Sequence, residues 1–192
     1  QIFQSMQSWT TPHLISGLPE MLSISISGSH ACGISRNAMA YCWLGLNSAG
    51  EFGDGTTNSS TGGVLVSGLS SVTQITLNYQ STCALKSDSK VWCWGANNVG
   101  QLGNGTLSPS STPVEIPNLV DVIELRSGNS SSCALVRSKN VYCWGDNSLG
   151  QLGDGTTRPR KIPTLVVGIS DVTELSSAAS TVCVIQAETD VY

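Results

Sequence analysis

Seven cysteines are the residues of this 192-residue chain whose spacing most directly predicts covalent chemistry. Each of three pairs brackets a short polar segment between two apolar runs, which is the pattern of a β-hairpin. Residues equidistant from a hairpin turn face each other, so each pair would lie within disulfide reach. Each bond would close a loop of about eleven residues and contribute about 2–3 kcal/mol. The expected disulfides, all with a spacing of ten residues, are Cys32–Cys42, Cys83–Cys93 and Cys133–Cys143.

Disulfide bonds predict an oxidising, extracellular compartment, because cytosolic thiols are kept reduced. Two other interpretations are open: reduced thiols that fill small apolar spaces, and a zinc site. Zinc has the weaker support, since the chain lacks both CxxC spacing and clustered histidines. Cys183 matches the first cysteine of each pair, but its partner would follow Tyr192, the last residue. We therefore expect Cys183 to be unpaired or bonded to another chain, and we expect the sequence to be truncated.

Other residue types that could do chemistry do not form a recognisable catalytic arrangement. Neither His13 nor His30 has a nucleophile and an acid near it in the sequence, and His30 is expected to be structural. Residues 146–150, Asp-Asn-Ser-Leu-Gly, resemble a calcium loop but lack the ligand alternation and the closing glutamate. No phosphate-binding loop and no GxSxG motif occurs. The sequence predicts no enzyme, no metal site and no cofactor.

Composition and sequons favour a secreted surface. The net charge is −4, and only 11% of the residues are charged against 40% hydrophobic. Serine and threonine crowd the expected loops at 56–61 and 108–112, and no apolar run is long enough to span a membrane. Basic residues are scattered except at 158–161, expected to be a solvated turn, so no nucleic-acid partner is predicted. Three sequons predict glycosylation, at Asn58, Asn104 and Asn129.

The elements that must position these residues are copies of one unit. Residues 92–106, WCWGANNVGQLGNGT, return at 142–156 as YCWGDNSLGQLGDGT and more weakly at 41–56. The first cysteines of the pairs and Cys183 are 51, 50 and 50 residues apart, which sets the period. The expected organisation is one repeat domain: a tail of a preceding unit at 1–16, repeats at 17–67, 68–117 and 118–167, and an incomplete repeat at 168–192.

Each unit is expected to consist of short strands. Apolar residues follow a period of two, helix signals are absent, and Val91-Trp92-Cys93-Trp94 places two tryptophans on one face and a cysteine on the other. Glycines in the repeated motif permit tight turns, and Asp154 or Asn104 can form an Asx turn. These turns explain the motif without a ligand, and the fold class expected is all-β.

The sequence C-A-L, a turn, and then VYCWGDNSLGQLGDGT resembles the repeat of the regulator of chromosome condensation family. The resemblance is strong over 68–192, weaker over 17–67 and absent over 1–9. It implies a β-propeller, usually of seven four-stranded blades around a central channel. The chain has four units, one of them incomplete. Three arrangements are open: part of a larger propeller, a small closed ring, or an open array completed by self-association.

The expected function is that of a non-catalytic secreted scaffold, a glycosylated subunit of an extracellular filament or surface layer. Its partners would be other copies of itself or another extracellular protein. The alternative is an extracellular propeller that binds a protein or a carbohydrate through its loops, as β-lactamase-inhibiting members of the family are understood to do. Phe3, Trp9 and Phe52 are candidate contacts, although Phe52 is expected in the core. Guanine nucleotide exchange on a small GTPase, the founding activity of the family, fits poorly with paired cysteines.

Overall fold

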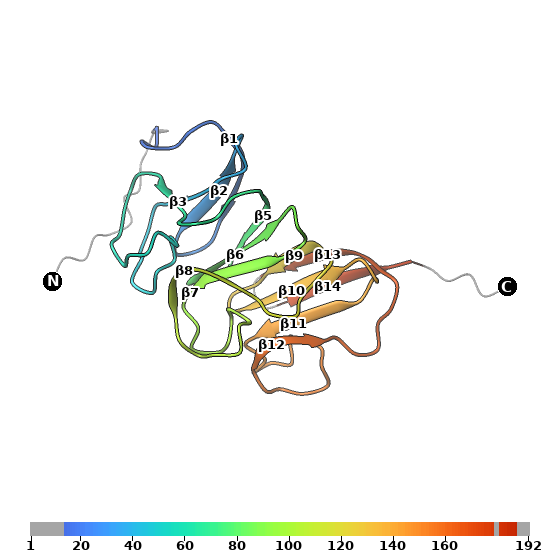
Figure 1. The fold of residues 1–192 in the computed structure, drawn as a ribbon. Helices are drawn as coiled ribbons and strands as arrows, with labels where there is room; N and C mark the ends of the chain where they lie inside the picture. Colours follow the sequence, from blue (N-terminus) through green and yellow to red (C-terminus); the bar gives the residue numbers. More distant parts are fainter. Residues whose placement is uncertain (1–13, 179–180, 188–192) are drawn as a thin grey trace.

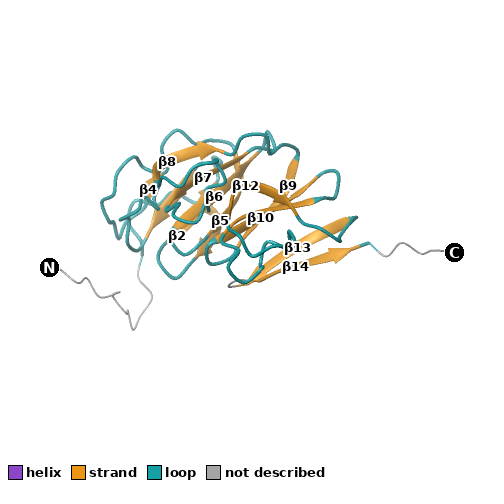
Figure 2. Cartoon of the chain, turned by 90° about the horizontal axis from the view of Figure 1, so that it is seen from below, coloured by secondary structure: helices purple, strands orange, loops and turns teal. Residues whose placement is uncertain are grey.

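The computed structural model of the chain describes residues 14–178 and 181–187, and every regular element in that part is a β-strand (Figures 1 and 2). The all-β expectation is therefore confirmed. The first two sheets comprise β1 (Met21–Ile26), β2 (Ala31–Ser35), β3 (Ala40–Trp43), β4 (Val64–Leu65), β5 (Val72–Leu77), β6 (Ser81–Lys86), β7 (Val91–Gly95) and β8 (Ser110–Glu115). The other two comprise β9 (Val122–Ser127), β10 (Ser131–Val136), β11 (Val141–Gly145), β12 (Arg160–Leu165), β13 (Val172–Ala178) and β14 (Thr181–Gln186).

The sheets are arranged as blades of a propeller. Three sheets have four antiparallel strands in chain order, and the last described sheet has two, β13 and β14. The first strands of neighbouring sheets, β1, β5, β9 and β13, contact one another along the array. The sheets follow one another in chain order and splay apart from their first strands, without closing into a ring over the described residues (Figure 1).

The family resemblance implied a fourth strand in each blade, but the sequence pattern did not predict where this outermost strand lies. Residues 110–112 were assigned to a Ser/Thr-rich loop, but they begin β8, which pairs with β7. β8 lies at the edge of its sheet and contains Pro113. Proline is tolerated at a sheet edge because its missing N–H need not join the ladder. The polar composition of this segment therefore reflects an exposed edge strand as well as a loop.

Three disulfide bonds join the second and third strands of the three complete blades. Within each pair the two cysteines are direct partners across the hairpin, at S–S distances of 2.11, 2.08 and 2.07 Å. All six bonded cysteines are buried. The bonded pairs are Cys32–Cys42, Cys83–Cys93 and Cys133–Cys143. Cys183 of β14 is exposed and has no disulfide partner among the described residues.

Each disulfide faces the following blade, and the buried tryptophans Trp94 and Trp144 face the preceding one. Cys93 packs in the cluster shared with the third blade, whereas Trp92 and Trp94 pack in the cluster shared with the first. The predicted alternation of tryptophan and cysteine is therefore confirmed. Leu125 on β9 completes the cluster around the Cys83–Cys93 bond. Every blade thus has two apolar faces, each of which needs a neighbour to bury it.

A glycine in each of the first two repeated loops lies directly against the tryptophan of the next blade. A methyl group added at Gly103 would lie 2.9 Å from Cδ1 of Trp144, and one added at Gly53 would lie 2.7 Å from Nε1 of Trp94. The indole N–H of Trp94 donates to the carbonyl of Glu51 at 2.8 Å, and that of Trp144 to Gln101 at 3.0 Å. The loop of one blade is therefore a part of the core of the next junction.

Replacement of Gly103 by alanine is expected to destabilise the fold more than the same change at Gly68. Both glycines have similar positive φ angles, +65° and +66°, but a methyl group at Gly68 would meet nothing within 4 Å. Both variants should lose about 1–2 kcal/mol from the left-handed backbone conformation. Gly103→Ala should lose about 1–3 kcal/mol more by displacing Trp144. Urea unfolding of the two variants measures the difference, and equal losses would contradict the proposed contact.

Candidate binding surface

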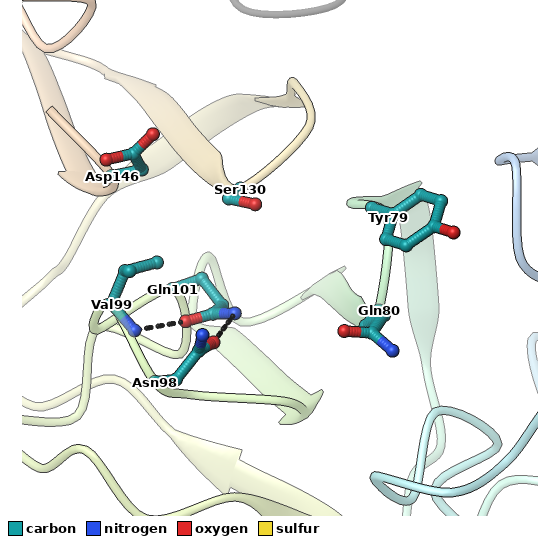
Figure 3. A pocket seen from close by; sticks show the side chains of 7 residues that line it. All are labelled: Tyr79, Gln80, Asn98, Val99, Gln101, Ser130 and Asp146. Atoms are coloured by element: carbon teal, nitrogen blue, oxygen red, sulfur yellow. Dashed lines mark hydrogen bonds between the residues drawn. The ribbon is translucent and has the colours of Figure 1, made fainter. Parts of the chain in front are cut away.

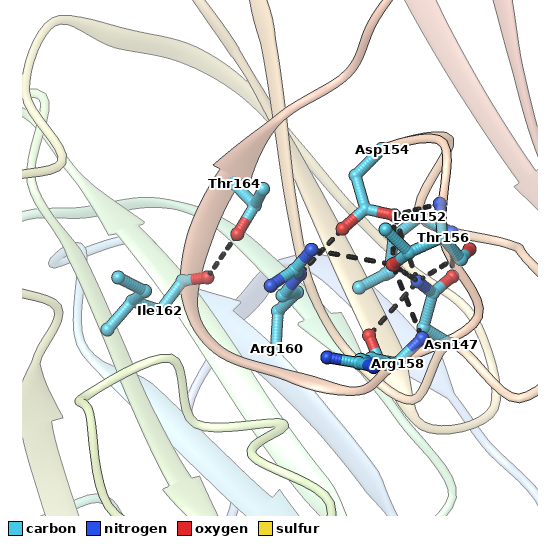
Figure 4. Close-up of polar contacts among 8 residues, drawn as sticks. All are labelled: Asn147, Leu152, Asp154, Thr156, Arg158, Arg160, Ile162 and Thr164. Carbon is cyan, nitrogen blue, oxygen red and sulfur yellow. Dashed lines mark hydrogen bonds and ion pairs between the residues drawn. The ribbon is translucent and has the colours of Figure 1, made fainter.

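An asparagine at the start of each long loop organises that loop. In the third blade, Oδ1 of Asn147 accepts from the backbone N–H of Leu152 at 3.0 Å (Figure 4). Its Nδ2 donates to the carbonyls of Thr156 and Arg158 at 3.1 and 3.0 Å. Asn47 and Asn97 make the corresponding bonds in the first two blades. The side-chain oxygen and nitrogen of the repeated asparagine thus form hydrogen bonds within its own loop. The residue is buried in all three copies.

The acidic residue of the loop also has a structural role. Asp154 accepts from the N–H and hydroxyl of Thr156 at 2.9 and 2.7 Å, and Nε of Arg160 lies 2.6 Å from Oδ2 (Figure 4). Burial opposes ionisation of Asp154, but the bonds from Thr156, Arg160 and Asn147 outweigh it and lower its pKa to about 2. Arg160 is therefore engaged within the loop, whereas Arg158 and Lys161 are exposed.

The tips of the first two loops are tied to the outer strand of the next blade. The N–H of Gly55 donates to the carbonyl of Ser111 at 2.9 Å, and that of Gly105 to the carbonyl of Lys161 at 2.8 Å. Together with the tryptophan contacts, these bonds make the whole Gly-rich motif a joint between blades. The repeated Gly-rich motif therefore has a structural role, as the sequence predicted.

The junction between the first two blades contains a buried histidine. Only 2% of His30 is exposed, and its Nε2 lies 2.7 Å from the hydroxyl of Thr82. Its Nδ1 lies 2.9 Å from the hydroxyl of Ser29. Burial lowers the pKa of His30 from 6.5 to about 4, so the ring is neutral at pH 7. Serines stand at the corresponding position of the next two blades, and His30 therefore distinguishes the first junction.

Glu51 at the same junction was not singled out from the sequence. Its side chain is fully buried; Oε2 accepts from the N–H of Ala49 at 2.9 Å, and Oε1 has no partner among the described residues. Burial raises the pKa of Glu51. Gln101 and Gln151 occupy the same place in the other loops, where their amides donate at 3.0 and 2.9 Å. The sequence does carry one indication of this site, because residue 51 is a glutamate where the other two loops have glutamine.

A small pocket lies between the loops of the second and third blades (Figure 3). Its volume is about 180 Å³, and Tyr79 is more than half exposed at its rim. The Asp146 carboxylate accepts from Ser148 and Gln151, so it is already engaged. The surface offers amides, hydroxyls and an aromatic ring, and no cationic side chain lines it. The lining residues are Tyr79, Gln80, Asn98, Val99, Gln101, Ser130 and Asp146.

Two apolar faces at opposite ends of the blade array are exposed. The leading face consists of Ile24 and Ile26 on β1; Ile24 is 59% exposed, whereas its counterparts Leu125 and Leu175 are 1% exposed. The trailing face consists of Glu174 on β13 with Cys183 and Ile185 on β14. Ile185 is 57% exposed, against 1% for its counterpart Leu135. Both faces therefore expose positions that neighbouring blades bury elsewhere in the fold.

The other predicted site residues are scattered. Asn58 and Asn129 are exposed in loops, and Asn104 is half-buried with its Oδ1 accepting from Thr106. Glycosylation at these three positions stays a prediction. Phe52 is fully buried, in agreement with its expected place in the core. Phe3, Trp9 and His13, together with most of the expected 1–16 tail, lie outside the described residues.

The described part of the chain contains neither a candidate metal cluster nor a candidate membrane-spanning helix. No cluster of three or more His, Cys, Asp or Glu side chains there is placed to hold a metal ion. The same residues contain no helix long and apolar enough to cross a membrane.

Two sequence profiles, both described as regulator of chromosome condensation (RCC1) repeat, match the chain. One covers residues 88–135 and 140–185, and the other 72–101 and 122–151. Together they cover 72–185 without a gap, more than half of the chain. The chain belongs to the RCC1 repeat family. Comparison of this RCC1-repeat protein with curated proteins gave no match.

Solved structures with the RCC1 fold are similar to this chain. Human WBSCR16 has a TM-score of 0.77 at 20% identity, with 88% of this chain and 45% of that chain covered. Yeast RCC1 (Prp20), solved bound to Kap60, has a TM-score of 0.76 at 17% identity, with 93% and 44% covered. The ectodomain of the Physcomitrella patens receptor kinase CR4 has a TM-score of 0.54 at 20% identity, with 87% and 38% covered. The RCC1-repeat chain thus spans less than half the length of these proteins.

Replacement of Glu51 by glutamine is expected to stabilise this RCC1-repeat protein at neutral pH. Because burial raises the folded-state pKa of Glu51 above its ordinary 4.5, its contribution to stability is present at low pH and is lost as pH rises through the folded-state pKa. Glu51→Gln should therefore gain about 1–3 kcal/mol at pH 7 and little at pH 4.

The matched control is the reverse change in the next loop, Gln101→Glu, which should lose stability at pH 7. Urea unfolding of both variants from pH 4 to pH 8 measures the effect. A Glu51→Gln difference that does not change with pH would show that the carboxylate is not destabilised in the folded state.

Proposed function

We propose that this chain is a non-catalytic extracellular scaffold that associates with copies of itself through exposed blade faces. The observation that carries the proposal is the exposure of Ile24, at a position that is buried at the second and third blade junctions. Leaving such a side chain in water forgoes about 1.5–3 kcal/mol of burial. Contact with another copy would recover this free energy.

Three disulfides support an extracellular location. Such bonds persist in oxidising compartments and are rare in cytosolic and nuclear proteins. The similarity of this fold to the CR4 receptor kinase ectodomain also supports the proposed location. We propose that Asn58, Asn104 and Asn129 carry glycans, with Asn104 the least accessible because its carboxamide oxygen is bonded within its turn.

Mass analysis of protein secreted from eukaryotic cells tests the location and the modifications. Without reduction, an alkylating reagent should label one thiol, Cys183, and after reduction it should label all seven cysteines. Enzymatic removal of N-glycans should lower the mass, and the decrease should persist in the Asn104→Gln variant. Labelling of seven thiols in the native protein would contradict the extracellular proposal.

Self-association is tested by sedimentation velocity over a wide range of protein concentration. The wild-type chain should form larger species as its concentration rises. Ile24→Asp should weaken association about tenfold or more, because it places a charge in the apolar contact. Leu107→Asp is the control, since Leu107 is an exposed loop leucine outside both faces. A wild-type chain that stays monomeric at every concentration would refute the scaffold function.

A second candidate function is the binding of a protein or a carbohydrate by the loop surface around Tyr79. The pocket of about 180 Å³ with its exposed aromatic rim favours this alternative. Yeast RCC1 (Prp20) is itself described with bound Kap60 and with binding properties toward Gsp1p and histones. Nucleotide exchange on a small GTPase has weaker support, because the disulfides favour a compartment outside the cytosol and nucleus.

A further inference from the structure

We propose that the pocket between the loops of the second and third blades binds one sugar ring of a neutral oligosaccharide. This inference rests on the second candidate function, binding by the loop surface around Tyr79, and adds the ligand class and the atoms that receive it. Both blades that form the pocket are complete and lie inside the array. The pocket therefore does not depend on what adjoins either end of the array.

Two amide side chains of the second blade form a fixed relay at one side of the pocket. Oε1 of Gln101 accepts from the backbone N–H of Val99 at 3.0 Å, so the Nε2 end of this amide faces Asn98. Nε2 donates to Oδ1 of Asn98 at 3.0 Å (Figure 3). Gln101 is only 4% exposed, so packing holds the relay in one orientation. The Nδ2 end of Asn98 is left as an oriented donor with no hydrogen bond to a described residue.

The third blade supplies acceptors across the pocket from these amides (Figure 3). The Asp146 carboxylate accepts three hydrogen bonds within its own loop, two from Ser148 and one from Gln151. A carboxylate has about four lone-pair sites, so one remains for a ligand hydroxyl. The hydroxyl of Ser130, which has no partner among the described residues, can donate or accept.

A donor side that faces an acceptor side matches a neutral polyol. Each sugar hydroxyl both donates and accepts, so hydroxyls of one ring can accept from Asn98 and donate to Asp146. No Lys or Arg lines the pocket, so an anionic ligand would meet Asp146 without a counter-charge. The volume of about 180 Å³ is below the range of about 300–1,000 Å³ for drug-sized ligands, which suits a single ring.

Tyr79 supplies an apolar surface beside the polar pocket. Its backbone N–H donates to the carbonyl of Asn129 at 2.8 Å, and a methyl group added at Gly28 would lie 3.4 Å from Cε2 of its ring. The ring is thus positioned by turns of the first and third blades, and 56% of the residue is exposed. Its hydroxyl points away from the other lining residues (Figure 3). The C–H face of a second sugar can stack on the ring, which covers apolar surface on both.

The equivalent place at the first junction is closed by the chain itself. The hydroxyl of Ser29 bonds there to the carbonyl of Tyr79. Gln80, which corresponds to Ser29, makes no side-chain hydrogen bond to a described residue at the second junction. Glu51 stands in place of Gln101, and a carboxylate has no N–H to donate to a neighbour. The open polar groups are therefore particular to the second junction and are not a general consequence of the repeat.

Titration of the unglycosylated, disulfide-bonded chain with tetrasaccharides, followed by NMR, tests the site. The neutral probes are cellotetraose, mannotetraose and chitotetraose, and tetragalacturonate is the anionic comparison. At least one neutral probe should bind with a Kd of about 0.1–1 mM, as expected for a few hydrogen bonds and one stacked ring. It should shift the side-chain amide signals of Asn98 and Gln101. The affinity should be equal at about 50 and about 500 mM NaCl, because no ion pair forms.

Replacement of Asn98 by aspartate removes the donor and keeps the relay. Oδ1 can still accept from Gln101, but the other end becomes an acceptor, so the affinity should fall about tenfold or more. Asn118→Asp is the matched control, because it makes the same change at an exposed residue of the linker between β8 and β9, at the opposite end of the strands. The control should bind as the wild type does, and urea unfolding should show that both variants are folded.

Replacement of Tyr79 tests the stacking. Tyr79→Ala should weaken binding about two- to tenfold through loss of the ring. Tyr79→Phe should retain the affinity, because the ring remains and the hydroxyl points away from the pocket (Figure 3). Equal weakening by the two substitutions would show that the ring is not the contact.

The oligosaccharide can come from another molecule or from this chain, because Asn129 begins a sequon directly before Ser130. The titration is therefore repeated with protein secreted from eukaryotic cells. If the glycan at Asn129 occupies the pocket, the added tetrasaccharide should bind only to the Asn129→Gln variant. Equal binding by the secreted wild type and this variant would assign the pocket to the glycan of another molecule.

The remaining outcomes separate this proposal from the functions proposed above. Binding of none of the neutral probes, tighter binding of tetragalacturonate, or an Asn98→Asp variant that binds as the wild type does would overturn the sugar site. The loop surface would then remain a candidate for binding a protein, and only the ligand class would be refuted. Self-association does not involve the pocket, so sedimentation velocity tests the scaffold function independently.

Discussion

Burial of the two apolar faces of each sheet against neighbouring sheets is the interaction on which the rest of the structure depends. One face carries the disulfide and leucines such as Leu85 and Leu135, and the other carries the tryptophans. A single sheet cannot bury either face alone. The loop motif, its asparagine and its glycines all serve to bring the tryptophan of one repeat onto the loop of the preceding repeat.

The features that could be predicted from the sequence are those that recur within it. The cysteine spacing, the strand alternation around Trp92 and Trp94, and the turn glycines each appear in several copies, so a local pattern sufficed. The outer strand β8 was missed because an edge strand tolerates serine and proline, which are typical of loops. The pocket around Tyr79 also could not be found, since its lining comes from four loops that only the fold brings together.

The three junctions share their apolar contacts but differ in their polar ones. The first uses His30 and Thr82, the second uses Gln74, and the third uses Glu124 with Arg126. These partners are about fifty residues apart, so no local pattern identifies them. Variation is concentrated in polar groups because an apolar mismatch would leave a cavity, whereas a hydrogen bond to backbone can be supplied by several side chains.

The indole bonds between repeats have a consequence for the order of events on the ribosome. The carbonyls of Glu51 and Gln101 receive their donors from tryptophans 43 residues later. A newly synthesised loop therefore stays without this partner until most of the following repeat has left the exit tunnel. The repeats should therefore fold in order from the amino terminus, and each new repeat should stabilise the one synthesised before it.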